Sequence, residues 1–109
     1  MIFKDEFWAM IPARKGSKSI KNKNILKINN VPLIGYSLNT ANKNKTIKKV
    51  IFSSDSKKYF RIAKKFGFDI AHLRGRNTSN DKASDLVIFK DFIKQFLRKN
   101  NILPKYFIH

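Results

Sequence analysis

Four short apolar runs are spaced along this chain, and each has the length of a buried strand. They are Phe7–Ile11, Val50–Phe52, Asp69–Leu73 and Tyr106–Ile108. Pro12 lacks a backbone donor and is expected to end the first strand, and Met1–Glu6 is expected to be a frayed start. The piece Ile25–Ile28, closed by the turn pair Asn29–Asn30, predicts a small strand or hairpin arm.

Three segments between these runs place apolar residues at helical spacing. Their predicted buried faces are Ile34, Leu38 and Ala41; Tyr59, Ile62, Ala63 and Phe66; and, within Lys82–Asn100, Leu86, Phe89, Ile93, Phe96 and Leu97. Pro32 suits the first turn of the first helix, and Ser53–Ser56 predicts a turn and cap before the second. Gly67 is expected to end that second helix. Strands that alternate with helices predict a doubly wound α/β fold around a mostly parallel sheet.

Composition restricts the chain to one small domain. The 109 residues are 42% hydrophobic, which is enough for a buried core and argues against disorder. Cysteine is absent, so disulfides and thiolate metal sites are excluded. No apolar run approaches a membrane span, and Asp5 and Glu6 stand where a signal peptide would be basic and then apolar. We therefore expect a cytoplasmic protein without a membrane partner.

The formal net charge of +17 raises nucleic acid as a partner. However, most of the 24 basic residues are lysines, and they are spread along the whole chain. Modules that bind bases use arginine and aromatic side chains on a defined platform, and no pattern of that kind is present. A basic nucleic-acid-binding module therefore stays as the alternative, and charge alone does not favour it.

A cationic loop follows the first strand, in the stretch Ile11–Asn24. Around the single glycine Gly16 it carries Arg14, Lys15, Lys18, Lys21 and Lys23. A strand that leads into a glycine-containing cationic loop suits phosphate binding, because backbone N–H groups can approach an anion and the side chains add charge. A solvated basic turn is the alternative that charge alone leaves open. The loop has neither the Walker A spacing nor GxGxxG.

The stretch resembles the N-terminal signature of the acylneuraminate cytidylyltransferases, the CMP-sialic acid synthetase family, which reads approximately I-P-A-R-x-G-S-K-x-I-x-x-K-N. The residues in register are Ile11, Pro12, Ala13, Arg14, Gly16, Ser17, Lys18, Ile20, Lys23 and Asn24. The resemblance extends to further segments of the chain. They are Val31–Ile34, Ile51–Asp55, Leu73–Arg74, where Gly75 replaces the family's proline, and Asp81–Ser84, where Asp85 replaces a second serine.

The resemblance covers about Trp8 to Ile108 and stops before the family's Leu-Gln-Pro-Thr-Ser-Pro segment. It implies a Rossmann-like fold of the nucleotide-diphospho-sugar transferase type. It also implies that residues 1–109 are a single partial domain, the N-terminal, CTP-binding half of the enzyme. The given sequence ends at His109, directly after the last apolar run, so that strand is expected to contribute no loop to the ligand edge of the sheet.

The activity that the resemblance implies is transfer of CMP from CTP to a sialic-type sugar acid, with release of pyrophosphate, for cell-surface glycan synthesis. N-acetylneuraminate, legionaminate and pseudaminate are the expected sugars. By resemblance, Arg14 and Lys23 are the catalytic cations on the triphosphate. The remaining nucleotide-binding residues that it implies are Ala13, Gly16, Ser17, Asn24, Arg74, Ala83 and Ser84, the last three near the cytosine.

The resemblance implies Mg²⁺ as cofactor, with its carboxylate ligands in the second half of the family's chain, and a homodimer for the full-length family. We therefore expect no metal ligand here: Asp55 is expected to cap a helix and Asp81 to organise a loop. His72 is expected to be a packed or half-exposed side chain. The other histidine is the final residue, so no His metal site or acid/base pair is expected. A truncated chain that binds nucleotide without turnover, or that needs a complementing chain, is the second alternative.

Overall fold

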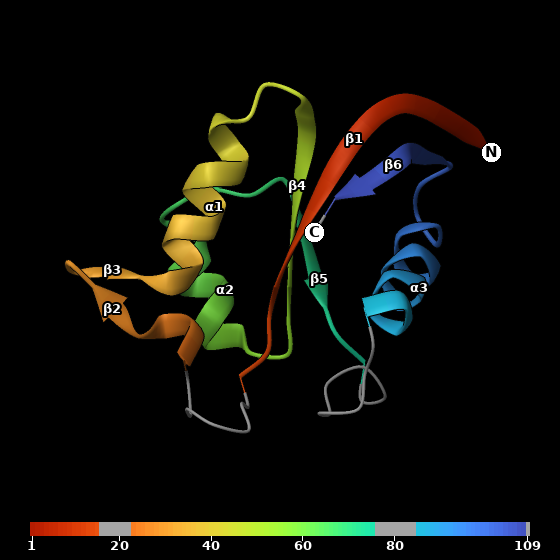
Figure 1. Cartoon of the computed structure of the whole chain (residues 1–109). Coiled ribbons are helices and arrows are strands. Elements are labelled where there is room, and N and C mark those ends of the chain that lie inside the picture. The colour runs from red at the N-terminus through yellow and green to blue at the C-terminus, as the bar shows by residue number, and fades with distance from the viewer. Residues whose placement is uncertain (16–22, 76–84, 109) are drawn as a thin grey trace.

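The computed structural model describes residues 1–15, 23–75 and 85–108. Within them, a parallel four-stranded sheet has the strand order β5-β4-β1-β6 (Figure 1). Its strands are β1 (Ile2–Ala13), β4 (Ile47–Ser54), β5 (Ile70–Leu73) and β6 (Ile102–Ile108). The helices are α1 (Leu33–Lys43), α2 (Lys57–Lys64) and α3 (Asp85–Phe96).

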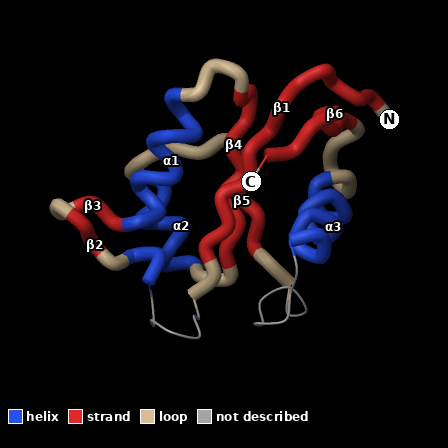
Figure 2. Tube along the Cα trace, in the orientation of Figure 1, coloured by secondary structure: helices blue, strands red, loops and turns tan. Residues whose placement is uncertain are grey.

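Helices cover both faces of this sheet. Figure 2 shows α1 and α2 on one side of the strands and α3 on the other. This arrangement confirms the predicted α/β fold with a parallel sheet. A one-turn helix, η1 (Lys23–Ile25), and an antiparallel pair, β2 (Lys27–Ile28) with β3 (Val31–Pro32), precede α1. Asn29 and Asn30 form the turn of this pair with φ of 52° and 67°, and the predicted hairpin is therefore confirmed.

The core on the α1 and α2 side follows the predicted helical spacing. Ile34, Leu38 and Ala41 of α1 are buried, as are Tyr59 and Ala63 of α2. They pack against the apolar side chains that β1 and β4 present to this face, namely Ala13, Val50 and Phe52. Burial of this stripe stabilises both helices, since short amphipathic helices depend mainly on tertiary packing.

The core on the α3 side is built around Trp8, which is completely buried. Its ring meets Phe96 of α3 edge-on, with ring centroids 5.5 Å apart. Ile88 and Phe92 of α3 are buried in this core, and neither was included in the buried face that the sequence predicted for this helix. Leu86 was predicted on that face, but it is 62% exposed. The reason is geometric: residues four apart, such as Ile88 and Phe92, lie on one side of the helix, and Leu86 lies off that line.

Strand β1 is longer at both ends than its apolar run predicts. The prediction that Met1–Glu6 frays is wrong, because β6 pairs with this segment and the N–H of Ile2 donates to the carbonyl of Asn101 at 2.9 Å. Pro12 does not end the strand either. The pairing with β4 continues through Pro12 and Ala13, which lie opposite Ser53 and Ser54, so the strand extends past the proline.

The junction of β4 and α2 also differs from the prediction. Ser53 and Ser54 were expected in a turn, but they are the buried last residues of β4. Ser56 is the N-cap of α2, and its Oγ accepts a hydrogen bond from the N–H of Tyr59 at 3.3 Å. Asp55 is therefore not the cap. Gly67 has the expected left-handed backbone, with φ of 93°, but lies two residues beyond the C-cap at Lys65.

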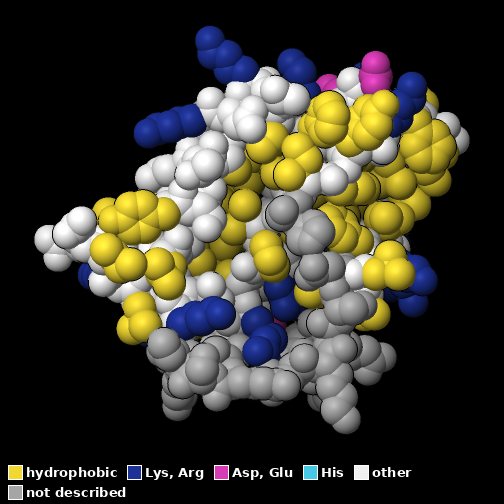
Figure 3. All heavy atoms as spheres, viewed as in Figure 1, with side chains coloured by type: hydrophobic (Ala, Val, Ile, Leu, Met, Phe, Trp, Pro, Cys, Tyr) yellow, Lys and Arg dark blue, Asp and Glu magenta, His cyan; other side chains and the backbone are white. Residues whose placement is uncertain are grey.

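Figure 3 shows hydrophobic side chains gathered over β1 and β6 at the upper right of the view. Exposed apolar residues of these strands include Ile2, Phe3, Tyr106 and Ile108. Phe7 and Tyr106 stack there with ring centroids 4.6 Å apart. This surface lies away from the carboxyl ends of β1, β4 and β5, which form the edge considered next.

Candidate nucleotide site

The carboxyl ends of three parallel strands are joined to one another by hydrogen bonds. The hydroxyl of Ser54 donates to the carbonyl of Ala13 at 2.6 Å, and the N–H of Arg74 donates to the carbonyl of Ser54 at 2.9 Å. Ala13 and Ser54 are both completely buried. The base of this edge is therefore fixed. Open parallel sheets bind ligands at this edge, beyond the carboxyl ends of their strands.

Arg14 and Lys15 are the first residues after β1, and polar contacts hold both backbones. The carbonyl of Arg14 accepts a hydrogen bond from the side-chain amide of Asn24 at 3.0 Å. The N–H of Lys15 donates to Oδ1 of Asp55 at 2.9 Å. Two basic side chains are thereby placed above the end of β1, with Arg14 half-buried and Lys15 exposed.

Asp55 has a different role from the predicted helix cap. Its carboxylate joins the segment after β4 to the segment after β1, through the N–H of Lys15. Burial raises the pKa of the neighbouring Tyr59 phenol, and the charge of Asp55 adds to that rise. Tyr59 is therefore a neutral core side chain, and Asp55 is a structural anion of the strand-end edge.

Lys23 and Asn24 lie in η1, directly before the β2–β3 hairpin. Asn24 is half-buried and contacts Arg14, whereas Lys23 is exposed. The structure therefore brings together Ala13, Arg14 and Asn24, with Lys23 next to Asn24 in the chain. The predicted residues Gly16, Ser17, Ala83 and Ser84, together with Asp81, lie outside the described residues.

Arg74 follows β5 and is buried, with 8% of its surface exposed. Its Nε donates a hydrogen bond to Oγ of Ser53 at 3.1 Å. The register between the strands accounts for this contact, because Ser53 of β4 lies opposite His72 of β5, close to the strand ends. The sequence-based prediction of Arg74 as a site residue therefore falls on a side chain that the fold holds at the same edge as Arg14.

A buried polar network behind Arg74 was not predicted. Nδ1 of His72 lies 2.8 Å from Oγ of Ser53, and Nε2 of His72 lies 2.7 Å from Oδ2 of Asp91 on α3. His72 is 1% exposed. The expectation of a packed side chain is thus confirmed, but the expectation that His72 lacks an acid partner is wrong. The partner is a carboxylate rather than the second histidine.

The sequence signal for this network was weak. Asp91 and Gln95 are four residues apart and therefore share one side of α3, where the side-chain amide of Gln95 donates to Asp91 at 2.9 Å. Burial lowers the pKa of His72, and the Arg74 guanidinium lowers it further, while the hydrogen bond and the charge of Asp91 oppose the shift. His72 is consequently a neutral side chain at physiological pH.

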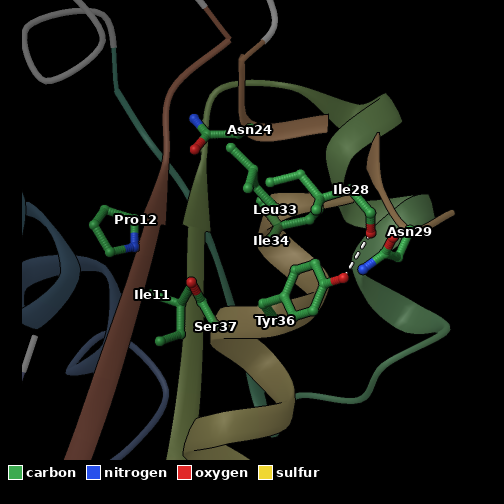
Figure 4. A pocket seen from close by; sticks show the side chains of 9 residues that line it. All are labelled: Ile11, Pro12, Asn24, Ile28, Asn29, Leu33, Ile34, Tyr36 and Ser37. Carbon is green, nitrogen blue, oxygen red and sulfur yellow. Dashed lines mark hydrogen bonds between the residues drawn. The ribbon is translucent and has the colours of Figure 1, made fainter. Parts of the chain in front are cut away.

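A pocket of ≈640 Å³ opens beside Asn24 (Figure 4). Its walls are β1, the β2–β3 hairpin and α1. The residues that line it are Ile11, Pro12, Asn24, Ile28, Asn29, Leu33, Ile34, Tyr36 and Ser37. The hydroxyl of Tyr36 donates to the carbonyl of Ile28 at 2.6 Å and holds the hairpin against α1. The strand-end edge thus has a hollow next to one of its predicted site residues.

The described residues do not form a magnesium site. Among them, no three His, Asp or Glu side chains gather closely enough to hold a metal ion. The Asp55 carboxylate is occupied by the N–H of Lys15, and Oδ2 of Asp91 is occupied by His72 and Gln95. Of the helices in the described part of the chain, none has the length and apolar character needed to cross a membrane.

A family model described as "Cytidylyltransferase" matches residues 8–104. CMP-N,N'-diacetyllegionaminic acid synthase of Campylobacter jejuni subsp. jejuni serotype O:2 is 37% identical over 79% of this chain and 37% of that protein. N-acylneuraminate cytidylyltransferase of Escherichia coli O18:K1:H7 is 40% identical over 82% of this chain and 20% of that protein. Pseudaminic acid cytidylyltransferase of the same Campylobacter strain is 36% identical over 85% of this chain and 40% of that protein. The chain therefore spans less than half the length of each of these relatives.

A solved structure of CMP:2-keto-3-deoxy-manno-octonic acid synthetase, complexed with CTP, superposes with a TM-score of 0.65. The superposition covers 91% of this chain and 39% of the chain in that structure, and the two are 21% identical in sequence. At this identity the likeness shows the fold alone. That fold agrees with the Rossmann-like α/β fold that the family resemblance implied.

Proposed function

Because the chain belongs to the cytidylyltransferase family, we propose that it binds CTP at the carboxyl ends of β1, β4 and β5 and serves transfer of CMP to a nonulosonic acid. The observation that carries the proposal is the convergence of Arg14, Asn24 and Arg74 on this one edge. The hydrogen bond from Asn24 to Arg14, and that from the backbone of Arg74 to Ser54, hold them there.

The triphosphate of CTP is the expected partner of the cationic loop. Arg14 and Lys23 flank the loop at its two ends, and the guanidinium of Arg14 can bind two phosphate oxygens at once. The backbone around Gly16 and the hydroxyl of Ser17 would add hydrogen-bond donors to the phosphates. The charge of the chain supports this role, since +17 draws polyanions toward it.

The proposed reaction is an in-line displacement at the α-phosphorus of CTP. The anomeric hydroxyl oxygen of the sugar acid forms the new bond to phosphorus, and the bond from phosphorus to the bridging oxygen breaks. Pyrophosphate leaves with the electron pair, and the hydroxyl proton is released. Such a step needs alignment and neutralisation of charge more than covalent participation of the protein. Since the described residues form no magnesium site, no step of the proposal passes through a metal.

The base of CTP is proposed to lie near Arg74, Ala83 and Ser84. Cytosine differs from uracil in having a donor at N4 and an acceptor at N3. A guanidinium suits the O2 and N3 acceptors, and backbone carbonyls suit the N4 donor. Arg74 supports this role because it is buried at the strand-end edge instead of extending into solvent.

The proposed second substrate is a nonulosonic acid such as N-acetylneuraminate, legionaminate or pseudaminate. The printed names of the relatives support that class, and their identities of 36%, 37% and 40% do not favour one sugar over another. Selection among these sugars is therefore left to the assay below.

Nucleotide binding is tested by thermal unfolding of the 109-residue chain with CTP, UTP, ATP and GTP. CTP at millimolar concentration is expected to raise the unfolding temperature more than the other nucleotides, because only ligands of the folded state stabilise it. Arg14→Ala should remove the shift. Arg61→Ala is the matched control, since Arg61 is an exposed arginine of α2. The absence of any CTP-dependent shift contradicts the proposal.

Turnover is tested separately, by pyrophosphate release from CTP with each of the three sugar acids in the presence of Mg²⁺. Release that depends on the sugar establishes the activity. A CTP shift without release identifies a nucleotide-binding chain that does not turn over alone. Tight and steeply salt-dependent binding to generic DNA or RNA, without a CTP shift, would favour the nucleic-acid alternative.

A further inference from the structure

Three side chains from three elements form a continuous buried chain behind Arg74. Ser53 belongs to β4, His72 to β5 and Asp91 to α3, and the two contacts that link them are 2.8 Å and 2.7 Å long. Ser53 is 0% exposed and His72 1%. Ser53 lies in the family-like segment Ile51–Asp55, whereas His72 and Asp91 lie outside the motifs named above, so their contacts with it need their own explanation.

The order serine, histidine, carboxylate is also that of a hydrolytic triad, but burial argues against such a role. A nucleophile must reach its substrate, whereas the Ser53 hydroxyl is completely enclosed. Its oxygen also already accepts the Nε–H of Arg74 at 3.1 Å. The network therefore acts on Arg74 and not on a substrate.

The proton positions follow from the donors at the two ends of the network. The Nε of Arg74 can only donate, so the oxygen of Ser53 is its acceptor and the Ser53 proton is left for Nδ1 of His72. Nε2 of His72 then carries the ring proton and donates it to Asp91. Among the described contacts of these side chains, every donor has an acceptor only when His72 is neutral and protonated at Nε2. A proton added at Nδ1 would turn the Ser53 hydroxyl away from its partner.

Helix α3 fixes the far end of this network. Asp91 also accepts from the side chain of Gln95 at 2.9 Å and from the N–H of Gly75 at 3.3 Å. Gln95 in addition donates to the carbonyl of Leu73 at 3.0 Å. The residues on both sides of Arg74 are thus bound to α3. Gly75 can make its contact because it has an N–H, which the proline of the family pattern would lack.

We propose that His72 is a positioning residue of the nucleotide site: through the hydroxyl of Ser53 it holds the guanidinium of Arg74 in the place where CTP binds. The inference rests on the CTP site proposed above. Asp91 orients His72 from α3, and a proton added at Nδ1 of His72 would take away the acceptor of the Ser53 hydroxyl and place a second positive charge beside the Arg74 guanidinium. Among the described residues, the charged groups around His72 are Asp91 and Arg74, with Arg98 and Lys99 lining a pocket of ≈320 Å³ beside the ring.

Two NMR measurements on the wild-type chain test the network without CTP. At about pH 7.5 the ring ¹⁵N shifts of His72 should show a neutral ring with its proton on Nε2. The Nε–H of Arg74, assigned by its loss in Arg74→Lys, should exchange slowly with solvent. A charged His72 ring, or a proton on Nδ1, overturns the proposal whatever the chain does with nucleotide.

Variants then connect the network to binding. His72→Phe keeps an aromatic ring against Phe92 and removes both ring hydrogen bonds, and Ser53→Ala removes the acceptor of Arg74. Each should speed exchange of the Arg74 Nε–H with solvent. Each should also weaken CTP binding about tenfold, which is the effect expected when one hydrogen bond to a charged group is lost. Thr46→Ala, in the exposed turn before β4, is the control and should change neither.

The pH profile separates positioning from a general loss of structure. Over the pH range in which the His72 ring of the wild type takes up a proton, as followed by its ring ¹⁵N shifts, CTP affinity of the wild type should fall relative to that of His72→Phe, because the phenyl ring cannot be protonated. Protonation of CTP affects binding to both proteins equally, so the ratio of the wild-type affinity to the His72→Phe affinity at each pH is independent of it. A constant ratio, or an Arg74 resonance that neither variant changes, overturns the positioning role. A wild-type chain that does not bind CTP instead contradicts the proposed function.

Discussion

The hydroxyl of Ser54 donates a 2.6 Å hydrogen bond to the carbonyl oxygen of Ala13, and this contact joins the carboxyl ends of β4 and β1. The hydroxyl oxygen of Ser54 also accepts a hydrogen bond from the N–H of Ser56 at 3.1 Å, just before α2 begins. One buried serine therefore sets the spacing between β1, which directly precedes Arg14, and α2, the helix that follows β4. Its removal tests whether the edge is built as described.

Ser54→Ala should lower the free energy of unfolding by about 1–3 kcal/mol, because a buried carbonyl and a buried N–H each lose their partner. Urea denaturation measures the change. Thr46→Ala removes an exposed hydroxyl and is expected to stay within about 0.5 kcal/mol of the wild type. If the two variants are equally stable, the contact to Ala13 does not support the strand ends.

The buried His72 predicts a pH-dependent stability. Burial lowers its pKa below the ordinary value of 6.5, so the unfolded chain takes up a proton at a higher pH than the folded chain. The free energy of unfolding should therefore fall as the pH is lowered through 6.5, by at most about 1.4 kcal/mol per pH unit for one proton, and the fall should end below the folded pKa.

Urea titrations of the wild type and His72→Phe at a series of pH values measure this effect as a difference between the two proteins. His109 is present in both and cancels. The wild type should lose stability relative to the variant on acidification. Parallel pH profiles would mean that His72 carries the same proton in the folded and the unfolded chain.

Gly35 sets the distance between α1 and the end of α2. A Cβ at this position would lie 2.7 Å from Cε1 and Cζ of Phe66 and 3.0 Å from Cγ1 of Val31. Gly35→Ala would gain about 1 kcal/mol of helix propensity, but overpacking costs about 1–3 kcal/mol. We expect a net loss of stability in urea denaturation.

Phe66→Leu provides the second arm of a double-mutant cycle with Gly35→Ala. Because the smaller side chain makes room for the new methyl group, Gly35→Ala should become neutral or stabilising in the Phe66→Leu background, which corresponds to a coupling of about 1 kcal/mol or more. Additive effects of the two substitutions would show that the contact between α1 and Phe66 does not limit the packing.

The sequence predicted what depends on local spacing. Leu38 and Tyr59 fall on their helix faces because the 3.6-residue period of a helix is visible in any short window. The polar residues Ser53 and His72 gave no such signal, since their contact depends on the register between β4 and β5. A serine after an apolar run suggests a turn, whereas here it ends a strand and bonds across the sheet.

Pairing between distant segments accounts for the other differences. The charged stretch before Phe7 has no strand pattern of its own, and it is extended because β6, about one hundred residues later, pairs with it. Asp91 likewise looks like a solvated helix residue until His72 is placed opposite it. The predicted site residues Arg14, Asn24 and Arg74 came from motif positions, and their roles toward CTP stay predictions until binding is measured.

Asn24 offers the sharpest test of the CTP site proposed at the strand-end edge, because its side-chain amide donates to the carbonyl of Arg14 at 3.0 Å. Asn24→Ala should weaken CTP binding by about tenfold, since Arg14 loses its anchor. Asn24→Asp should weaken it further, because a carboxylate cannot donate to the carbonyl and places a negative charge beside the triphosphate.

The extra loss in Asn24→Asp should shrink as salt is raised, since it comes from charge repulsion that ions screen. Asn100→Asp is the matched control. Asn100 makes the same kind of bond, to the carbonyl of Phe96 at 3.0 Å, at the far end of α3. Isothermal titration with CTP at low and high salt measures all three variants. Equal losses in Asn24→Asp and Asn100→Asp would show that the triphosphate does not bind beside Asn24, because only the overall charge of the chain would then matter.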